Sequence, residues 1–242
     1  MDLTFTTGQT NMLIGCLLGN ANLYTQSESS GFARKGFTWR ARFFHKAVHL
    51  PYAEHKYQIL KDFCIQKPTL SSFLDKRTKE TYERYYFNTK ISNEFTFLAN
   101  LFYKKENDIW KKRLPKNISH YLNAETIAYW YMDDGALIWQ GRSNAVRLCT
   151  DSFSDSEVAL LKKSLEEKFS LKCSIQKKNG ISRISILEES YPKLKALILP
   201  YLLPCMFYKF PDGNNGVMNN EDILEDIRNT FRERERFEFE EK

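Results

Sequence analysis

The chain has 242 residues, of which 42% are hydrophobic and 27% are charged, so it can build one large domain or two small ones, and wholesale disorder is excluded. No apolar run approaches the roughly 20 residues that span a bilayer, and the N-terminus carries Asp2 and no basic segment, unlike a secretory signal. Residues 1–212 have a net charge of +10 and residues 213–242 a net charge of −4, which predicts a basic body with a polyanionic partner.

The first half of the sequence alternates helical and strand-like patterns. Residues 11–23 are apolar and rich in small side chains, over a length that gives about three helical turns. Residues 37–46 alternate between polar or basic and apolar side chains, which predicts a strand with one wet, cationic face and one buried face. The patterns that follow predict a helix over 51–66, a second alternating strand over 82–90 and a helix over 93–103.

The second half repeats this order, which predicts a duplicated α+β unit. The acidic tail is compatible either with a mixed-charge helix that covers the body or with a free terminus. The predicted elements of the second half are a helix over 124–137 ending at Gly135, a strand over 145–150, a helix starting at a capping box of Ser154 and Glu157, a hairpin turning at Asn179-Gly180 and a helix near 190–199.

Two segments carry a recognisable motif. LIGCLLGNA (13–21) and IAYWYMDDGA (127–136) resemble the two LAGLIDADG helices of single-chain homing endonucleases, and the resemblance extends from about Leu13 to Pro211. It is strongest to the branch of this family typified by the omega-intron endonuclease of yeast mitochondria.

The resemblance implies an α+β fold of two pseudo-symmetric halves, residues 1–123 and 124–212, each with an antiparallel sheet that forms part of a DNA-binding saddle. The tail, residues 213–242, lies outside the resemblance. The two motif helices are expected to pack on each other, and small residues would let their backbones approach closely, although a helical glycine costs about 1 kcal/mol against alanine. The small residues on the first motif helix are Gly15, Gly19 and Ala21.

The resemblance also implies a cleavage centre where the two motifs end. In this family the acid that closes each motif binds a divalent cation against the DNA backbone, and Mg²⁺ suits such a site because it takes only one or two protein carboxylates. Mn²⁺ would serve as well, with Ca²⁺ as a non-catalytic substitute. Asp134 matches the acid of the second motif, whereas Asn20 stands in the first, and Asp133 is expected to make a structural hydrogen bond. Lys112 and Lys209 match the paired basic residues that the family places near the scissile phosphates.

Asn20 is the main departure from the family pattern. Its amide can offer a neutral oxygen to a cation but no negative charge, so metal binding and water activation should be weak. Either the natural protein has lost double-strand cleavage, or the chain carries an Asp-to-Asn change made to trap an uncut complex. We expect Asn20→Asp to raise the activity, and a variant that binds the site yet never cuts would favour a maturase or a binding protein instead.

DNA contacts are expected from the polar side of the strands, because a β-ribbon fits the major groove, and from the loops that follow the motif helices. The four histidines, His45, His49, His55 and His120, have no arrangement that demands a metal and are interpreted as structural or surface residues. The DNA-binding candidates are Tyr24, Gln26, Arg40, Arg42, Lys46, Arg84, Tyr86 and Asn88 in the first half, and Trp139, Gln140, Arg142, Arg147, Lys177 and Arg183 in the second.

Two functions remain open from the sequence. The first is a monomeric, site-specific DNA endonuclease that makes a metal-dependent double-strand break in a long duplex, impaired by Asn20. The second is an intron RNA maturase, or a nucleic-acid-binding protein that keeps the fold without cleavage. The resemblance implies a location in a mitochondrion or chloroplast, with no membrane partner.

Overall fold

The computed structural model describes residues 4–25, 39–213 and 220–240, without the side chains of 220 and 233–240. The first half contains α1 (Thr7–Leu18), β1 (Asn22–Thr25), β2 (Trp39–Lys46), α2 (Leu50–Ile59), β3 (Thr69–Asp75), β4 (Glu80–Asn88) and α3 (Glu94–Phe102). A hairpin of β5 (Tyr103–Glu106) and β6 (Ile109–Lys112) and the short α4 (Ile118–Tyr121) lead to the second half. That half contains α5 (Ala124–Asp134), β7 (Gly135–Leu137), β8 (Val146–Leu148), α6 (Asp155–Phe169), β9 (Cys173–Lys178), β10 (Ile181–Ile186) and α7 (Tyr191–Ile198).

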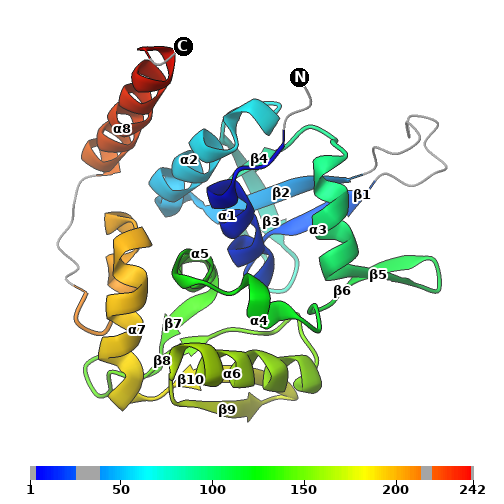
Figure 1. The fold of residues 1–242 in the computed structure, drawn as a ribbon, viewed down its shortest axis with the longest axis vertical. Coiled ribbons are helices and arrows are strands. Elements are labelled where there is room, and N and C mark those ends of the chain that lie inside the picture. Colours follow the sequence, from blue (N-terminus) through cyan, green and yellow to red (C-terminus); the bar gives the residue numbers. More distant parts are fainter. Residues whose placement is uncertain (1–3, 26–38, 214–219, 241–242) are drawn as a thin grey trace.

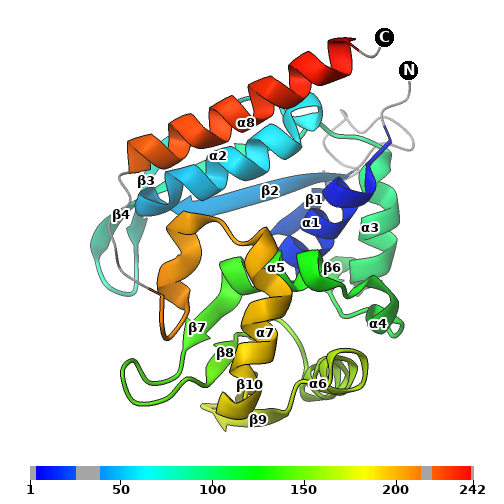
Figure 2. The ribbon, with the colours of Figure 1, turned by 60° about the vertical axis from the view of Figure 1, so that its left-hand side comes forward.

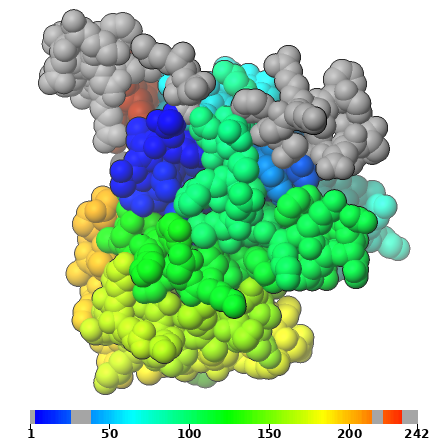
Figure 3. Space-filling model, turned by 45° about the vertical axis from the view of Figure 1, so that its right-hand side comes forward, coloured from blue at the N-terminus to red at the C-terminus, as the bar shows by residue number. Residues whose placement is uncertain are grey.

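The two halves share one topology. Their antiparallel sheets have the strand orders β1-β2-β4-β3 and β7-β8-β10-β9, so each strand of the first sheet has a counterpart at the same place in the second. The sheets lie on either side of the α1–α5 pair (Figures 1 and 2), and the space-filling view shows the halves as one continuous body (Figure 3). The predicted duplicated α+β fold is confirmed.

The central contact between α1 and α5 depends on glycine. A Cβ atom added to Gly15 would lie 2.5 Å from the carbonyl oxygen of Thr126, and one added to Gly19 would lie 2.5 Å from Cβ of Asp133. Neither gap admits a methyl group, so alanine at either place would push the helices apart. The close approach predicted for these two glycines is therefore observed.

Each sheet buries one face under helices and leaves the other open. In β2 the side chains of Trp39, Ala41 and Phe43 are buried, while Arg40 and Arg42 are half-buried on the other side. α2 and α3 pack on the buried side of this sheet, and α6 packs on that of the second sheet. The period of two predicted for 37–46 is confirmed over the described strand.

Several element boundaries differ from the sequence patterns. The first motif helix begins at Thr7, because Thr6 and Gln9 form a capping box among polar residues, and it ends at Leu18 rather than near residue 23. The helix expected over 51–66 ends at Ile59. Strands β1, β3, β5, β6 and β7 were not predicted, because they are short or lack a buried alternating face.

Two local predictions are confirmed in detail. Ser154 and Glu157 form the capping box that starts α6. Asn179 and Gly180 turn the β9–β10 hairpin with φ angles of 52° and 79°, the left-handed pair that this dipeptide favours.

The acidic tail contains a helix, α8 (Asn220–Glu240), which lies along α2 (Figure 2). Ile223, Leu224 and Ile227 bury its apolar side. Of the two alternatives for the tail, the structure shows the covering helix. None of the helices in the described parts of the chain is long and apolar enough to cross a membrane.

Candidate active site and nucleic-acid interface

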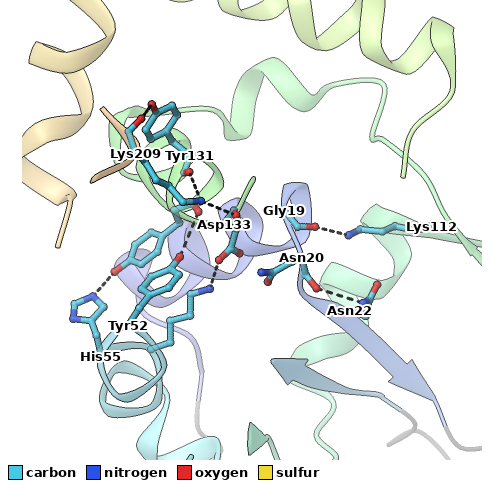
Figure 4. Close-up of polar contacts among 11 residues, drawn as sticks. Gly19, Asn20, Asn22, Tyr52, His55, Lys112, Tyr131, Asp133 and Lys209 are labelled. Carbon is cyan, nitrogen blue, oxygen red and sulfur yellow. Dashed lines mark hydrogen bonds and ion pairs between the residues drawn. The ribbon is translucent and has the colours of Figure 1, made fainter. Parts of the chain in front are cut away.

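The C-termini of α1 and α5 lie side by side but end in different residues. α1 is followed by buried Gly19 and exposed Asn20, whereas α5 ends with Asp133 and Asp134. Asn20 and Asp133 line one cavity of about 590 Å³, which Lys209 also borders, and Figure 4 shows the three residues around the helix ends. The two motif ends therefore share one solvent-accessible space.

Each motif helix is capped by a lysine from its own half. Lys112 Nζ donates to the carbonyl oxygens of Gly19 and Ala21, at 3.3 and 3.0 Å. Lys209 Nζ donates to the carbonyl oxygens of Tyr131 and Asp133, at 3.4 and 2.9 Å (Figure 4). A cation in this position satisfies free carbonyl groups and the negative end of the helix dipole. The two predicted lysines thus occupy equivalent places.

Asp134 lies in a crowded electrostatic environment. Burial and, to a smaller extent, the neighbouring Asp133 carboxylate raise the pKa of its carboxyl to about 6, against the opposing effect of Lys209 and Lys112. Burial lowers the pKa of each lysine to about 8. Within the described residues no side chain or backbone group donates a hydrogen bond to the Asp134 carboxylate, so its oxygens are available to a ligand.

Asp133, by contrast, is fixed inside the protein. Its Oδ1 accepts a 2.6 Å hydrogen bond from Lys56 Nζ of α2, and both side chains are fully buried. Burial alone would lower the pKa of Lys56, but the Asp133 carboxylate more than compensates, so the pKa is raised. This ion pair joins α5, the second motif helix, to α2. Lys56 was missed by the sequence patterns, although a lysine one turn after Tyr52, on the apolar side of a predicted helix, is a signal that could have found it.

The open face of the first sheet collects most of its predicted DNA-binding residues. The registers place Arg42 opposite Asn88, and Lys46 opposite Arg84. Gln26 lies outside the described residues. The candidates that share this face are Tyr24, Arg40, Arg42, Lys46, Arg84, Tyr86 and Asn88.

The second sheet differs from the prediction at one residue. Arg147 and Arg183 lie on its open face, but Lys177 is paired with Ser182 and points to the other side, where it donates to Asp155 at the start of α6. Lys177 therefore does not share the open face with the other candidates, because the Asn179-Gly180 turn sets a register that places this residue on the helix-covered side. Gln176 and Lys178 occupy the open face instead. Trp139, Gln140 and Arg142 are exposed in the loop between β7 and β8.

The two open faces also differ in charge pairing. Arg183 donates to both carboxylate oxygens of Asp151, at 2.6 and 2.5 Å, and Arg147 donates to Gln176 at 3.0 Å. On the first sheet, no carboxylate among the described residues pairs with Arg40, Arg42 or Arg84. Both faces are cationic. Among the described residues, Arg183 of the second face pairs with an acid, and none of these three arginines of the first face does.

The model of the LAGLIDADG DNA endonuclease family matches residues 10–194, which is most of the chain. The chain belongs to this family. Its fold confirms the prediction of two pseudo-symmetric LAGLIDADG halves with antiparallel sheets.

Relatives and solved structures of the LAGLIDADG family agree with this assignment. The chain is 36% identical to "DNA endonuclease I-ChuI" of Chlamydomonas applanata over 223 residues, which is 88% of this chain and 99% of that protein. It is 32% identical over 130 residues to "Cytochrome b mRNA maturase bI2" of Saccharomyces cerevisiae, 51% of this chain and 29% of that protein. The structure of the homing endonuclease I-WcaI bound to its DNA recognition sequence superposes with a TM-score of 0.74 at 26% identity, covering 86% of this chain and 87% of that one.

Two of the four histidines of the LAGLIDADG chain, His45 and His49, border the cavity at the motif ends. His45 is buried on the helix-covered side of β2, and burial holds its pKa well below the usual range. His49 Nε2 is 3.0 Å from the hydroxyl of Tyr208, His55 Nε2 is 2.8 Å from that of Tyr129, and His120 is exposed. No group of three or more His, Cys, Asp or Glu side chains is arranged to hold a metal ion in the parts of the chain that the structure describes.

Proposed function

We propose that the protein is a site-specific DNA endonuclease whose cleavage centre lies at the ends of α1 and α5, and that Asn20 limits it to slow cleavage or to cleavage of one strand. The observation that carries this proposal is the pair of equivalent lysine caps around unequal helix ends. Lys112 and Lys209 are placed alike, but only the α5 end supplies a carboxylate that is free to bind a ligand.

The residues at the helix ends fit a hard divalent cation such as Mg²⁺ or Mn²⁺. The donors there are oxygens: the unpartnered carboxylate of Asp134 and the side-chain amide of Asn20. Burial, and secondarily the nearby Asp133 carboxylate, raise the pKa of Asp134, so a bound cation would stabilise the charged form of this carboxylate. When bound, such a cation supplies a water of lowered pKa and stabilises the leaving oxygen.

The chain's own residues do the remaining work. Asp134 would position the hydrated cation, and Lys112 and Lys209 would each place a positive charge beside one scissile phosphate. Their pKa values of about 8 keep both lysines mostly protonated at neutral pH, while leaving them closer to titration than a surface lysine. Asn20 would hold the cation of its half-site without negative charge, so that half should react more slowly.

The partner we propose is a long DNA duplex lying across the open faces of both sheets. The net charge of +10 on residues 1–212 and the arginines of those faces support it, as does the similarity to I-WcaI, which was solved on DNA. A single chain supplies both motif helices, so we propose that it acts as a monomer; light scattering of the chromatographed protein would test this.

The test is a cleavage assay on a site that the protein itself selects. Binding to randomised duplexes in Ca²⁺, which we expect not to support cleavage, gives a preferred sequence that is then cloned into a supercoiled plasmid. With Mg²⁺ the protein should nick this plasmid, and linear product should form slowly or not at all. Equally fast linearisation by this chain and by Asn20→Asp would refute the role of position 20, and a chain that binds no duplex specifically would refute the proposal.

A second function is favoured by one finding, the similarity of half the chain to an mRNA maturase. In that case the chain would bind its intron RNA tightly and leave the plasmid uncut even as Asn20→Asp. Filter binding to the transcribed intron, measured beside the duplex, separates the two functions. For either we propose an organellar location, which fractionation of the host would test.

A further inference from the structure

Aromatic rings and arginine side chains alternate across the open face of the first sheet. The Cζ atom of Arg42 lies 5.1 Å from the ring centre of Tyr24 and 5.4 Å from that of Phe44. The Cζ atom of Arg84 lies 4.5 Å from the ring centre of Phe44 and 4.4 Å from that of Phe73. These five residues come from all four strands, so they form an arginine–aromatic ladder that crosses the whole sheet.

Phe44 is the centre of this ladder, because it is the ring that contacts both arginines. It stands on the polar side of β2, between Arg42 and Lys46, where the alternation would otherwise place a polar residue. A guanidinium group over an aromatic ring is held by dispersion and by the ring quadrupole, while its five N–H donors stay in the plane of the group. The ring therefore orients an arginine without using any of its hydrogen-bond donors.

The donors of these arginines have no other use in the described residues. Nε of Arg42 and of Arg84 is buried without a hydrogen-bond partner, and neither guanidinium forms a described ion pair. On the second sheet the equivalent orientation is done by a carboxylate, since Asp151 takes two donors of Arg183. The first sheet thus presents oriented arginines with their donors free, and a buried donor without a partner is costly until an acceptor arrives.

We propose that Phe44 is a positioning residue for DNA recognition: it holds Arg42 and Arg84 ready for paired hydrogen bonds to guanines in the major groove. This inference rests on the proposed DNA-binding function. Arginine pairs with the O6 and N7 acceptors of guanine, and β2 and β4, which carry the two arginines, are the central strands of the face that would enter the groove. The DNA half-site that contacts this sheet should therefore contain guanines whose recognition depends on Phe44.

The benefit of Phe44 should be entropic. An arginine that is already ordered loses less side-chain freedom on binding than one that must be immobilised in the complex. With two arginines affected, Phe44→Leu should weaken binding to the selected duplex by roughly tenfold. Binding to duplexes in which the relevant guanines are replaced should change by less than about twofold, because those complexes never gained the paired hydrogen bonds.

The experiment uses the full chain and the duplex selected from the randomised library, with single-base variants and with 7-deazaguanine in place of each guanine. The proteins compared are the parent, Phe44→Leu, Phe44→Tyr, which keeps the ring, and Arg84→Lys, which keeps the charge and loses the fork. We expect Phe44→Leu to lose discrimination at two guanines and Arg84→Lys at one, with Phe44→Tyr close to the parent. The 7-deaza substitution should weaken the parent and leave Phe44→Leu almost unchanged at those positions. The salt dependence should be the same for parent and Phe44→Leu, since no charge is removed.

Four results would overturn the inference. Uniformly weaker binding of Phe44→Leu to every duplex would mean that the ring only supports the fold, which thermal unfolding of the variant would show independently. Insensitivity of the parent to 7-deazaguanine would mean that the arginines contact phosphates. A selected site with unchanged discrimination in Phe44→Leu would refute the role of Phe44 while leaving the DNA-binding function intact, whereas failure of the parent to select any sequence would refute both.

Discussion

The two motif helices occupy equivalent places in the fold and carry different chemistry. α1 and α5 each start a half, lead into a four-stranded sheet of the same strand order and receive a lysine at the C-terminus. α1, however, is followed by Gly19 and Asn20, whereas α5 ends in Asp133 and Asp134. The two halves therefore share their strand order and their lysine caps, but only α5 carries acids at its end.

The difference at the first of these two positions has a packing reason. Gly19 and Asp133 meet at the helix contact, and a side chain on both helices would not fit, since a Cβ on Gly19 already collides with Asp133. One helix must therefore carry the small residue, and the other can carry an acid if a buried cation compensates it. No such reason applies to Asn20, which is exposed. The asymmetry at position 20 is chemical and should be reversible, while that at position 19 is structural.

The largest effect is expected from neutralising the remaining free acid. Asp134→Asn should lower the rate of the residual nicking by about 1000-fold, because no free carboxylate would remain at either helix end. The same change should stabilise the metal-free protein at pH 7. A carboxyl with a raised pKa stabilises the fold below its unfolded value near 4, and this contribution is lost as the pH rises through about 6. Asparagine avoids that loss, so Asp134→Asn should raise the free energy of unfolding at pH 7 by about 2 kcal/mol.

Two measurements check this prediction. Plasmid nicking gives the rate, and thermal unfolding at pH 4 and pH 7 gives the stability difference, which should shrink at the lower pH. A variant that is both inactive and less stable at pH 7 would indicate that Asp134 has a structural role.

The second effect tests whether the asymmetry at Gly19 and Asp133 is structural. Lys56→Met should lower the free energy of unfolding by about 3–5 kcal/mol, because it leaves the Asp133 carboxylate buried without its partner. The matched control is Lys162→Met, which breaks a pair of the same 2.6 Å length with Glu166 on the surface of α6. That change should cost less than about 1 kcal/mol. Denaturant titration of both variants gives the loss in the free energy of unfolding for each. Similar losses would contradict a structural role for the buried Lys56–Asp133 pair.

Asn20→Asp should reverse the chemical asymmetry. We expect the rate of linearisation to rise by about 100-fold, because the variant restores an anionic ligand at the second helix end. DNA affinity should change little, since the two side chains have nearly the same shape. If linearisation stays slow while nicking is unchanged, the limit lies elsewhere in the first half.

Local features of the fold and the site could be predicted from the sequence, whereas non-local features could not. The duplicated order, the strand parity of 37–46 and the Asn179-Gly180 turn were predicted because each depends on a short-range pattern. Lys56 and the arginine–aromatic ladder were not, because they join segments far apart in the chain. Lys177 was misplaced for the same reason: its face depends on the strand register, and a shift of one residue reverses it.

The lysine caps should also be unequal in effect. Lys209 acts on the pKa of Asp134 more strongly than Lys112 does, and it caps the helix that carries this acid. Lys209→Met should therefore slow nicking by about tenfold more than Lys112→Met does. The control repeats both lysine substitutions in the Asn20→Asp background. With acids on both helix ends, the two substitutions should slow nicking by more similar factors. Equal effects in the parent chain would mean that the lysines do not act through their own helix ends.

The smallest effect concerns the sheets, where the halves differ in how their arginines are oriented. Asp151→Asn should release Arg183 from its carboxylate on the open face of the second sheet, so that it can contact a phosphate. Affinity for a random-sequence duplex should rise by about threefold, and the slope of log Kd against log salt should increase by about 0.9.

The matched control is Asp155→Asn, which adds the same unit of charge but frees Lys177 on the opposite, helix-covered side. Its slope should stay near that of the parent, because a lysine on that side cannot reach DNA lying across the open face. Equal increases in the two variants would mean that only net charge matters. A larger increase for Asp151→Asn would instead show that acids on the second sheet hold back arginines that the first sheet leaves free.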